Sequence, residues 1–331
     1  MDLNTKIYVA GHSGLVGSAL LWRLQSKGYT NIVTRTHAKL DLTDQAATEV
    51  FFATEKPEFV FLAAAKVGGI LANNIYPADF ISVNLAIQNN VIQAAYRHGV
   101  KRLLFLGSSC IYPRDCPQPI KEEYFLSGLL EPTNRSYAIA KIAGIEQCWS
   151  YNRQYGTQFL AAMPTNIYGR GDNYDPVKAH VIPALIRKFH EAKTHDDNEA
   201  VVWGTGTPKR EFLYCDDLAD ASVFLMCLAN EAFDSILNTR SLVPPIINIG
   251  GGKEITIREL AETVKRVVGF QGKIIFDPSK PDGTPRKLLD STNINKLGWT
   301  PKIGLLEGIS KSYEDFLQQL LSLSQDRGVC S

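Results

Sequence analysis

The segment Lys6-Ile7-Tyr8-Val9-Ala10-Gly11-His12-Ser13-Gly14-Leu15-Val16-Gly17 is the strongest indication of the fold of this chain. Its first five residues predict a short buried strand, and an amphipathic run from Leu15 to Lys27 predicts a helix. Three glycines between them permit a tight turn and a close approach of backbone to a pyrophosphate. The helix N-terminus adds free N–H groups and a positive dipole end. The stretch therefore predicts a dinucleotide site.

Apolar strands alternate with helical stretches as far as about Pro164. Strands are expected at 7–10, 31–34, 59–64, 102–107 and 158–163, and helices notably at Val83–His98 and Ser136–Tyr155. This order predicts an α/β fold with a Rossmann-type doubly wound parallel sheet. After Asn166 many glycines and prolines mark loops and short elements, which predicts a smaller α/β substrate-binding lobe.

The expected domain boundaries follow from the increase in glycine and proline after Asn166. We assign 1–165 and about 214–249 to the cofactor-binding domain, about 166–213 and 250–320 to the substrate lobe, and 321–331 to a disordered tail. Within the second stretch, the segments Asp216–Ala229 and Ile246–Ile249 are expected to return to the sheet.

Composition excludes several classes of function. The 331 residues are 45% hydrophobic with a formal net charge of +1 and no long block of like charge, so neither nucleic acid nor an anionic membrane is an expected partner. No apolar run reaches the ~18 residues of a membrane span. Residues 1–6 lead directly into the first strand and leave no room for a signal peptide. The six cysteines lack metal-ligand spacing, so we expect no metal and a cytoplasmic protein with reduced thiols.

Ser108-Ser109-Cys110 stands at the end of an apolar run, and the pair Tyr137-x-x-x-Lys141 follows about thirty residues later. On a helix, residues four apart share a face, so both side chains can enter one cleft. A free tyrosine titrates near ~10, and a nearby ammonium is expected to favour its phenolate. Ser108 could then hold a carbonyl oxygen while Tyr137 exchanges a proton with it. These are the two functional groups that hydride transfer at a carbonyl requires.

The spacing Gly-x-x-Gly-x-x-Gly resembles that of the extended short-chain dehydrogenase/reductase superfamily. Arg35 stands at the end of the second strand, where an NAD site usually carries an acid, and an arginine there suits a 2′-phosphate and favours NADP(H). Asp41-Leu42 resembles the pair that caps adenine in this superfamily. The small residues Ala63–Ala65 leave room for the nicotinamide ribose.

Longer strings make the resemblance more specific. They are Ala63–Ile70, Asn73–Phe80, Leu106–Pro113, Glu131–Asn134, Tyr137–Ile145, Met163–Gly169, His180–Leu185 and Lys280–Lys287. Together they are similar to the GDP-L-fucose synthases, over roughly Lys6 to Phe316. The resemblance implies an NADPH-dependent conversion of GDP-4-keto-6-deoxy-D-mannose to GDP-L-fucose, by epimerisation at C3 and C5 and reduction at C4. It also implies a homodimer, which in the superfamily usually pairs helices such as Val83–His98 and Ser136–Tyr155.

The same resemblance implies roles for individual residues. Cys110 is the expected base and His180 the expected acid of epimerisation, while Ser108, Tyr137 and Lys141 act at the C4 oxygen. The cofactor contacts it implies are Gly11, Ser13, Gly14, Leu15, Val16, Gly17, Arg35, Asp41, Leu42, Ala63, Ala64, Ala65, Lys141, Pro164, Asn166, Ile167 and His180. The substrate contacts are Ser109, Asn166, Lys188, Trp203, Arg210, Asp282 and Lys287.

The chain departs from the family's pattern at three places. Ser13 and Lys188 stand where arginine is common, and Gly169–Tyr174 replaces the usual Gly-Pro-His-Asp-Asn-Phe. A different nucleotide-sugar enzyme, such as a 4-epimerase or a 4,6-dehydratase, is one alternative, although Ser-Ser-Cys offers no acidic proton shuttle for a dehydratase. A catalytically silent NADP(H)-binding regulatory protein is another, against which the full set of five catalytic residues argues.

Overall fold

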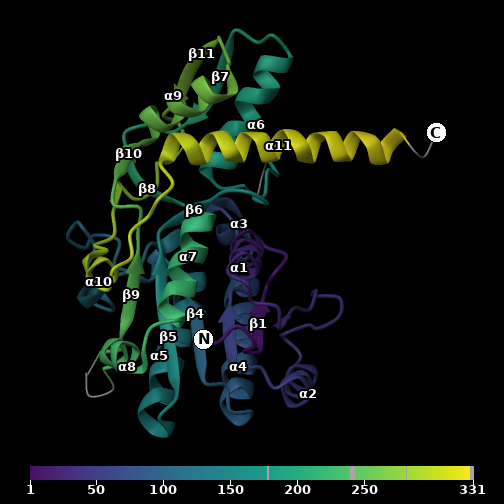
Figure 1. The fold of residues 1–331 in the computed structure, drawn as a ribbon. Coiled ribbons are helices and arrows are strands. Elements are labelled where there is room, and N and C mark those ends of the chain that lie inside the picture. The colour runs from purple at the N-terminus through teal and green to yellow at the C-terminus, as the bar shows by residue number, and fades with distance from the viewer. Residues whose placement is uncertain (177–178, 239–242, 281, 329–331) are drawn as a thin grey trace.

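The computed structural model describes residues 1–176, 179–238, 243–280 and 282–328. A larger α/β unit holds the N-terminus, and a smaller lobe of short strands and helices lies at one end of it (Figure 1). The long C-terminal helix crosses near the boundary of the two and extends beyond both.

The larger unit is built on one six-stranded sheet in which every pairing is parallel. Its order is β2-β1-β3-β4-β5-β9. The strands are β1 (Ile7–Ala10), β2 (Ile32–Val33), β3 (Phe59–Leu62), β4 (Arg102–Leu106), β5 (Gln158–Pro164) and β9 (Ile246–Ile249). The sheet confirms the predicted Rossmann-type fold. Its winding reverses between β1 and β3, and ligands bind at the carboxyl ends of strands beside such a point.

Helices cover both faces of this sheet. Two separate apolar cores, one on each face, bury the helices against it. One face carries α1 (Leu15–Ser26) and α7 (Cys215–Met226), and the other α2 (Gln45–Glu55), α4 (Pro77–Arg97) and α5 (Arg135–Tyr155). The helix α4 begins at Pro77 rather than at the predicted Val83, because proline suits the first turn of a helix, where its missing N–H costs nothing.

The smaller lobe contains two small sheets. In one, β8 (Lys209–Tyr214) pairs with β6 (Asn166–Tyr168), β10 (Glu254–Thr256) and β12 (Arg286–Lys287), and in the other β7 (Glu199–Trp203) pairs with β11 (Lys273–Asp277). The remaining helices are α3 (Ile70–Ile75), α6 (Val181–Thr194), α8 (Asn230–Leu237), α9 (Ile257–Val268), α10 (Thr292–Lys296) and α11 (Leu305–Gly328).

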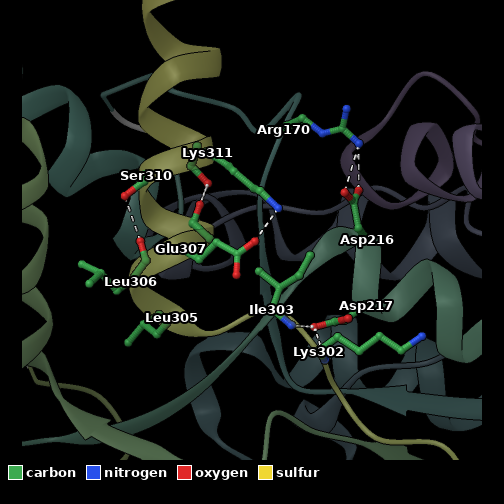
Figure 2. A network of polar contacts seen from close by, with 12 residues as sticks. Arg170, Asp216, Asp217, Lys302, Ile303, Leu305, Leu306, Glu307, Ser310 and Lys311 are labelled. Carbon is green, nitrogen blue, oxygen red and sulfur yellow. Dashed lines mark hydrogen bonds and ion pairs between the residues drawn. The ribbon is translucent and has the colours of Figure 1, made fainter.

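Two acids at the start of α7 tie the larger unit to loops that lead into the lobe and the last helix (Figure 2). Asp216 accepts two hydrogen bonds from Arg170, at 3.0 and 3.1 Å. Asp217 accepts the backbone N–H groups of Lys302 and Ile303 at 3.0 and 2.8 Å. A carboxylate with two N–H donors is well satisfied when partly buried, so this junction anchors the chain just before α11.

Helix α11 runs from Leu305 to Gly328 and packs against the apolar core through Ile309 and Phe316. The predicted domain bounds and the predicted disordered tail at 321–331 stay predictions. Residues 329–331, with Cys330, lie outside the described part of the chain.

Several absences can be stated for the described residues. No helix among them is both long and apolar enough to span a bilayer. No group of three or more His, Cys, Asp or Glu side chains within the same ranges could hold a metal ion. The five cysteines that the structure describes are free thiols.

Candidate active site

Ser108 and Cys110 lie on one turn at the carboxyl end of β4. Ser108 has extended backbone and caps a short 3-10 helix over Ser109–Ile111, where its Oγ accepts the N–H of Cys110 at 3.3 Å. Ser109 and Cys110 are both buried. The turn thus places a hydroxyl and a thiol side by side, at the sheet edge where parallel α/β folds bind ligands.

Lys141 attaches α5 to this same edge. Its Nζ donates to the carbonyl of Leu106, the last residue of β4, at 2.7 Å. The same Nζ lies 5.8 Å from the ring centroid of Tyr137, which packs edge-on against Phe80 with 6.2 Å between centroids. The two residues are about one helical turn apart on α5, so the tyrosine and the lysine both lie near the end of β4, as the spacing predicts.

Burial dominates the protonation of this group. Burial raises the pKa of Tyr137, and the neighbouring Cys110 adds to the effect. Burial also lowers the pKa of Lys141 to about 8. Desolvation is the largest cause of both shifts, and the expected effect of the Lys141 ammonium on the Tyr137 phenolate stays a prediction. A phenol that keeps its proton at neutral pH suits the reductive direction, in which Tyr137 donates.

Cys110 is linked by charge to a residue of the smaller lobe. Burial raises the pKa of the Cys110 thiol, while the ammonium groups of Lys287 and Lys141 and a hydrogen bond from Ser108 oppose that rise. Lys287 is in β12 and pairs with Arg210 of β8. The strand pairing thus sets Lys287 beside Arg210, and the Lys287 ammonium lies near enough to the Cys110 thiol to favour its thiolate.

His180 is the first residue before α6, where it is the N-cap without a capping side-chain bond. The residue keeps exposed surface, yet surrounding protein atoms lower the pKa of its imidazole by desolvation. Among the described residues, which exclude the nearby 177–178, no charged side chain contributes to that shift, unlike the shifts of Cys110 and Lys141. The structure therefore gathers four of the five predicted catalytic residues into one group, and the role of His180 stays a prediction.

The glycine loop fits a dinucleotide. Gly11 has φ +83°, and a Cβ there would lie 2.7 Å from the backbone nitrogen of Ala64, while a Cβ on Gly17 would lie 2.0 Å from the Gly11 carbonyl oxygen. Close backbone contact therefore requires glycine at both positions. Gly14 caps α1 without a side chain, so the N–H groups of the first turn face outward from the loop. The buried Nδ1 of His12 has no hydrogen-bond partner, which leaves it available to a ligand.

The other predicted cofactor residues occupy the surrounding strand ends. Ala63–Ala65 follow β3, the neighbour of β1, and Pro164 ends β5. Asn166 and Ile167 open β6, and the amide of Asn166 donates to the Glu211 carbonyl at 2.8 Å. Ser13 lies in the glycine loop, and Leu15 and Val16 begin α1.

Arg35, Asp41 and Leu42 lie beyond β2. Nη1 of Arg35 donates to the carbonyl of Thr34 at 2.8 Å, and Nη2 pairs with Glu55 at 2.5 Å. Asp41 accepts the N–H and hydroxyl of Thr43 at 2.9 and 2.8 Å, and these bonds lower the pKa of its carboxyl. Leu42 is buried. Asp41 is thus an anchored anion, and Arg35 is a cation already held by protein groups.

Replacing Arg35 by alanine is expected to raise the KM for NADPH about 10-fold or more, because one charge-assisted contact contributes roughly 1.5–3 kcal/mol. The KM for NADH should change less than about twofold. Steady-state kinetics with both cofactors measures this, with Arg97→Ala on α4 as the control. Equal changes for the two cofactors would refute a contact to the 2′-phosphate.

Trp203 of the lobe lies between two lysines, of which Lys188 is a predicted substrate residue and Lys280 is not. Trp203 is 59% exposed, with Lys188 Nζ 6.0 Å and Lys280 Nζ 5.7 Å from its ring centroid. Lys188 also donates to the Val201 carbonyl. An exposed indole flanked by two cations is suited to a base or sugar that carries a diphosphate.

Asp282 has a local role beside its predicted one. One carboxylate oxygen accepts the N–H of Thr205 at 2.7 Å, and the other accepts its hydroxyl at 2.8 Å. Each oxygen retains a lone pair for a further donor. The preceding residue, Pro281, lies outside the described residues.

Sequence reasoning missed two buried polar residues behind the site. Glu211, fully buried, accepts the N–H groups of Gly252 and Leu289 at 2.7 and 3.1 Å. Asn248 accepts the hydroxyl of Tyr112 at 2.6 Å and donates to the carbonyls of Ile120 and Asp290 at 3.0 and 3.2 Å. Glu211 on β8 of the lobe binds Leu289, and Asn248 on β9 of the larger unit binds Asp290, so both hold the segment that follows Lys287. The polar Asn248 within the apolar run of β9 was the available signal.

Comparisons with known proteins show the family of this chain. Residues 7–250 match the model of the NAD dependent epimerase/dehydratase family. The chain is 58% identical to a putative GDP-L-fucose synthase 2 of Arabidopsis thaliana, over 98% of this chain and 95% of that protein. It is 52% identical to the GDP-L-fucose synthase of Escherichia coli K12, over 97% and 98%.

Among solved structures, a GDP-D-glycero-L-gluco-heptose synthase from Campylobacter jejuni, crystallised in the presence of NADPH, is similar with a TM-score of 0.87. It is 40% identical, over 96% of this chain and 99% of that one. The chain therefore belongs to the NAD dependent epimerase/dehydratase family and, within it, to the GDP-L-fucose synthases.

Proposed function

We propose that this chain is an NADPH-dependent enzyme that converts GDP-4-keto-6-deoxy-D-mannose into GDP-L-fucose. The observation that carries the proposal is the group of Ser108, Cys110, Tyr137 and Lys141 at the end of β4, with Lys287 beside it. This set combines a polarising hydroxyl, a proton donor and a thiol base around one position. The alternative of a silent binding protein requires none of these three chemical functions.

Epimerisation needs a polarised ketone and a base. The C4 ketone acidifies the hydrogens on C3 and C5, and Ser108 and Tyr137 would hold its oxygen as the enolate forms. Cys110 removes the proton and His180 supplies one to the opposite face. Burial of Cys110 raises its pKa, so the nearby cations of Lys287 and Lys141 are needed to stabilise the thiolate.

Reduction uses the same oxygen contacts. When bound, NADPH supplies the hydride for C4. Tyr137 retains its proton at neutral pH and gives it to the C4 oxygen, while Lys141, held by the Leu106 carbonyl, fixes the helix that carries the tyrosine. One polarised ketone thereby serves two epimerisations and one reduction.

The GDP group is assigned to the lobe. Lys188 and Arg210 can neutralise the diphosphate, Trp203 can stack on guanine or sugar, and Asp282 can accept guanine N–H groups. The support is the exposed Trp203 ring between two ammonium groups, together with the pairing of Arg210 and Lys287.

The experiment that tests the proposal follows NADPH absorbance after addition of GDP-4-keto-6-deoxy-D-mannose, with the product sugar identified by NMR. Stoichiometric oxidation with GDP-L-fucose as product is expected. A rhamno- or talo-configured product would keep the reductase and remove the epimerase roles of Cys110 and His180. Absence of oxidation would move the function to another nucleotide sugar.

We also propose a cytoplasmic homodimer that pairs α4 and α5 with their copies. The free thiols fit a reducing compartment. Between the two helices, Leu85, Ala86, Asn89, Ala143 and Gln147 line a surface hollow of about 460 Å³. Small side chains there permit close approach of a second copy. Ala143→Arg should shift the mass measured by light scattering from dimer to monomer, and an unchanged mass would exclude this face.

A further inference from the structure

The side chain of Arg35 is held by three protein groups. Its Nη1 donates to the Thr34 carbonyl at 2.8 Å, its Nη2 pairs with Glu55 at 2.5 Å, and its guanidinium lies 5.5 Å from the Phe51 ring centroid. A guanidinium has five N–H donors. Arg35 is therefore positioned by its neighbours, yet keeps donors that can meet a further anion.

Glu55 ends α2 and carries a full negative charge there. Besides Arg35, it pairs with Lys6 at 2.8 Å, and its side chain is 20% exposed. The hydrogen bond from Lys6, and then the charges of Lys6 and Arg35, lower the pKa of the Glu55 carboxyl. The carboxylate is ionised at neutral pH and directly contacts the cation predicted to recognise the cofactor.

A 2′-phosphate carries about −1.5 to −2 charge at neutral pH. As it approaches Arg35, it is attracted by the guanidinium and repelled by the carboxylate just beyond it. At the other predicted contact, Ser13 provides a neutral hydroxyl and no second positive charge, so it does not offset the charge of Glu55. Lys6 offsets part of this repulsion, and what remains makes the electrostatic field around Arg35 less favourable to the 2′-phosphate than it would be with a neutral residue at position 55.

We propose that Glu55 is a specificity-determining residue that weakens the preference for NADP(H) over NAD(H) by partly neutralising Arg35. The proposal rests on the proposed contact between Arg35 and the 2′-phosphate. A purely positioning role for Glu55 predicts the opposite sign, because loss of an anchor would weaken NADP(H) binding.

The test is Glu55→Gln, which keeps a carbonyl oxygen for Arg35 at the same reach and removes the charge. Isothermal titration calorimetry with NADP⁺ and NAD⁺ measures the result without turnover, and adenosine 2′,5′-bisphosphate against 5′-AMP isolates the 2′-phosphate. The Kd for NADP⁺ is expected to fall about 3- to 10-fold, because the substitution removes a negative charge that repels the negatively charged 2′-phosphate. The Kd for NAD⁺, which lacks this phosphate, is expected to change less than about twofold.

The matched control is Glu49→Gln on the same helix. Glu49 is also a paired carboxylate, with His98 at 2.8 Å and Arg97 at 3.3 Å, but it does not contact Arg35. Glu49→Gln should leave the Kd values for NADP⁺ and NAD⁺ unchanged. An equal gain in NADP⁺ affinity from Glu49→Gln would mean a general charge effect and would overturn the role of Glu55.

A second variant, Glu55→Ser, removes the acceptor as well as the charge and provides the same test should Glu55→Gln fold poorly. It is expected to change NADP⁺ affinity in the same direction. Weaker or unchanged NADP⁺ binding in the folded variants overturns the proposal. Arg35→Ala distinguishes the two ways in which the proposal can fail. Unchanged NADP⁺ affinity in Arg35→Ala would show that Arg35 does not contact the 2′-phosphate, whereas weaker affinity would show that the contact exists and that only the effect of Glu55 is wrong.

Discussion

Tyr137→Phe is expected to lower the rate of NADPH oxidation by about 10²- to 10⁴-fold, the usual contribution of a positioned general acid. Burial raises the pKa of Tyr137, so the hydroxyl carries its proton at neutral pH and its removal deletes the donor for the C4 oxygen. The ring would remain packed on Phe80, which leaves the site in place.

Pre-steady-state absorbance at saturating substrate measures the reduction, and calorimetry with NADP⁺ measures cofactor binding, which should change less than about twofold. Tyr174→Phe is the matched control, because it removes a buried hydroxyl that donates to the Ser312 carbonyl at 2.8 Å, away from the site. Normal turnover of Tyr137→Phe would end the assignment of Tyr137 as proton donor.

Cys110→Ser is expected to slow exchange of the C3 and C5 hydrogens with solvent by about 10²-fold or more, since a serine hydroxyl is a far weaker base than a thiolate. Ser108 and Tyr137 remain, so slow direct reduction of the unepimerised ketone should persist. Incubation of substrate in D₂O, followed by NMR or mass spectrometry, measures deuterium incorporation at each carbon.

The pH dependence of the same exchange gives an independent check. The active form of Cys110 is the thiolate, and burial raises the thiol pKa, so exchange by the native enzyme should rise as pH increases from about 6 to 9. Cys148→Ser is the control, because Cys148 is a buried thiol on α5 outside the site. Normal exchange in Cys110→Ser, or a pH-independent rate in the native enzyme, would show that another group is the base.

Local pattern was enough to predict most of the larger unit. The run of apolar residues before the glycine loop, and the 3.6-residue periodicity of the stretch that carries Tyr137 and Lys141, are properties of short segments. Such segments predicted the parallel sheet and placed Lys141 beside the end of β4, where its ammonium bonds Leu106. The start of α4 was not predicted correctly from the sequence, because Pro77 opens that helix ahead of the apolar repeat.

Sequence pattern alone was sufficient for the Rossmann-type sheet and the glycine loop, and it predicted the residues that we propose to carry the chemistry. Which groups from distant segments meet depends on the tertiary structure. Parallel pairing of β12 with β8 sets Lys287 beside Arg210 and near Cys110, and the end of α2 brings Glu55 to Arg35. The protonation of Tyr137 was likewise decided by burial. Desolvation and charge–charge energies depend on distances between segments far apart in the chain, and no local pattern encodes those distances.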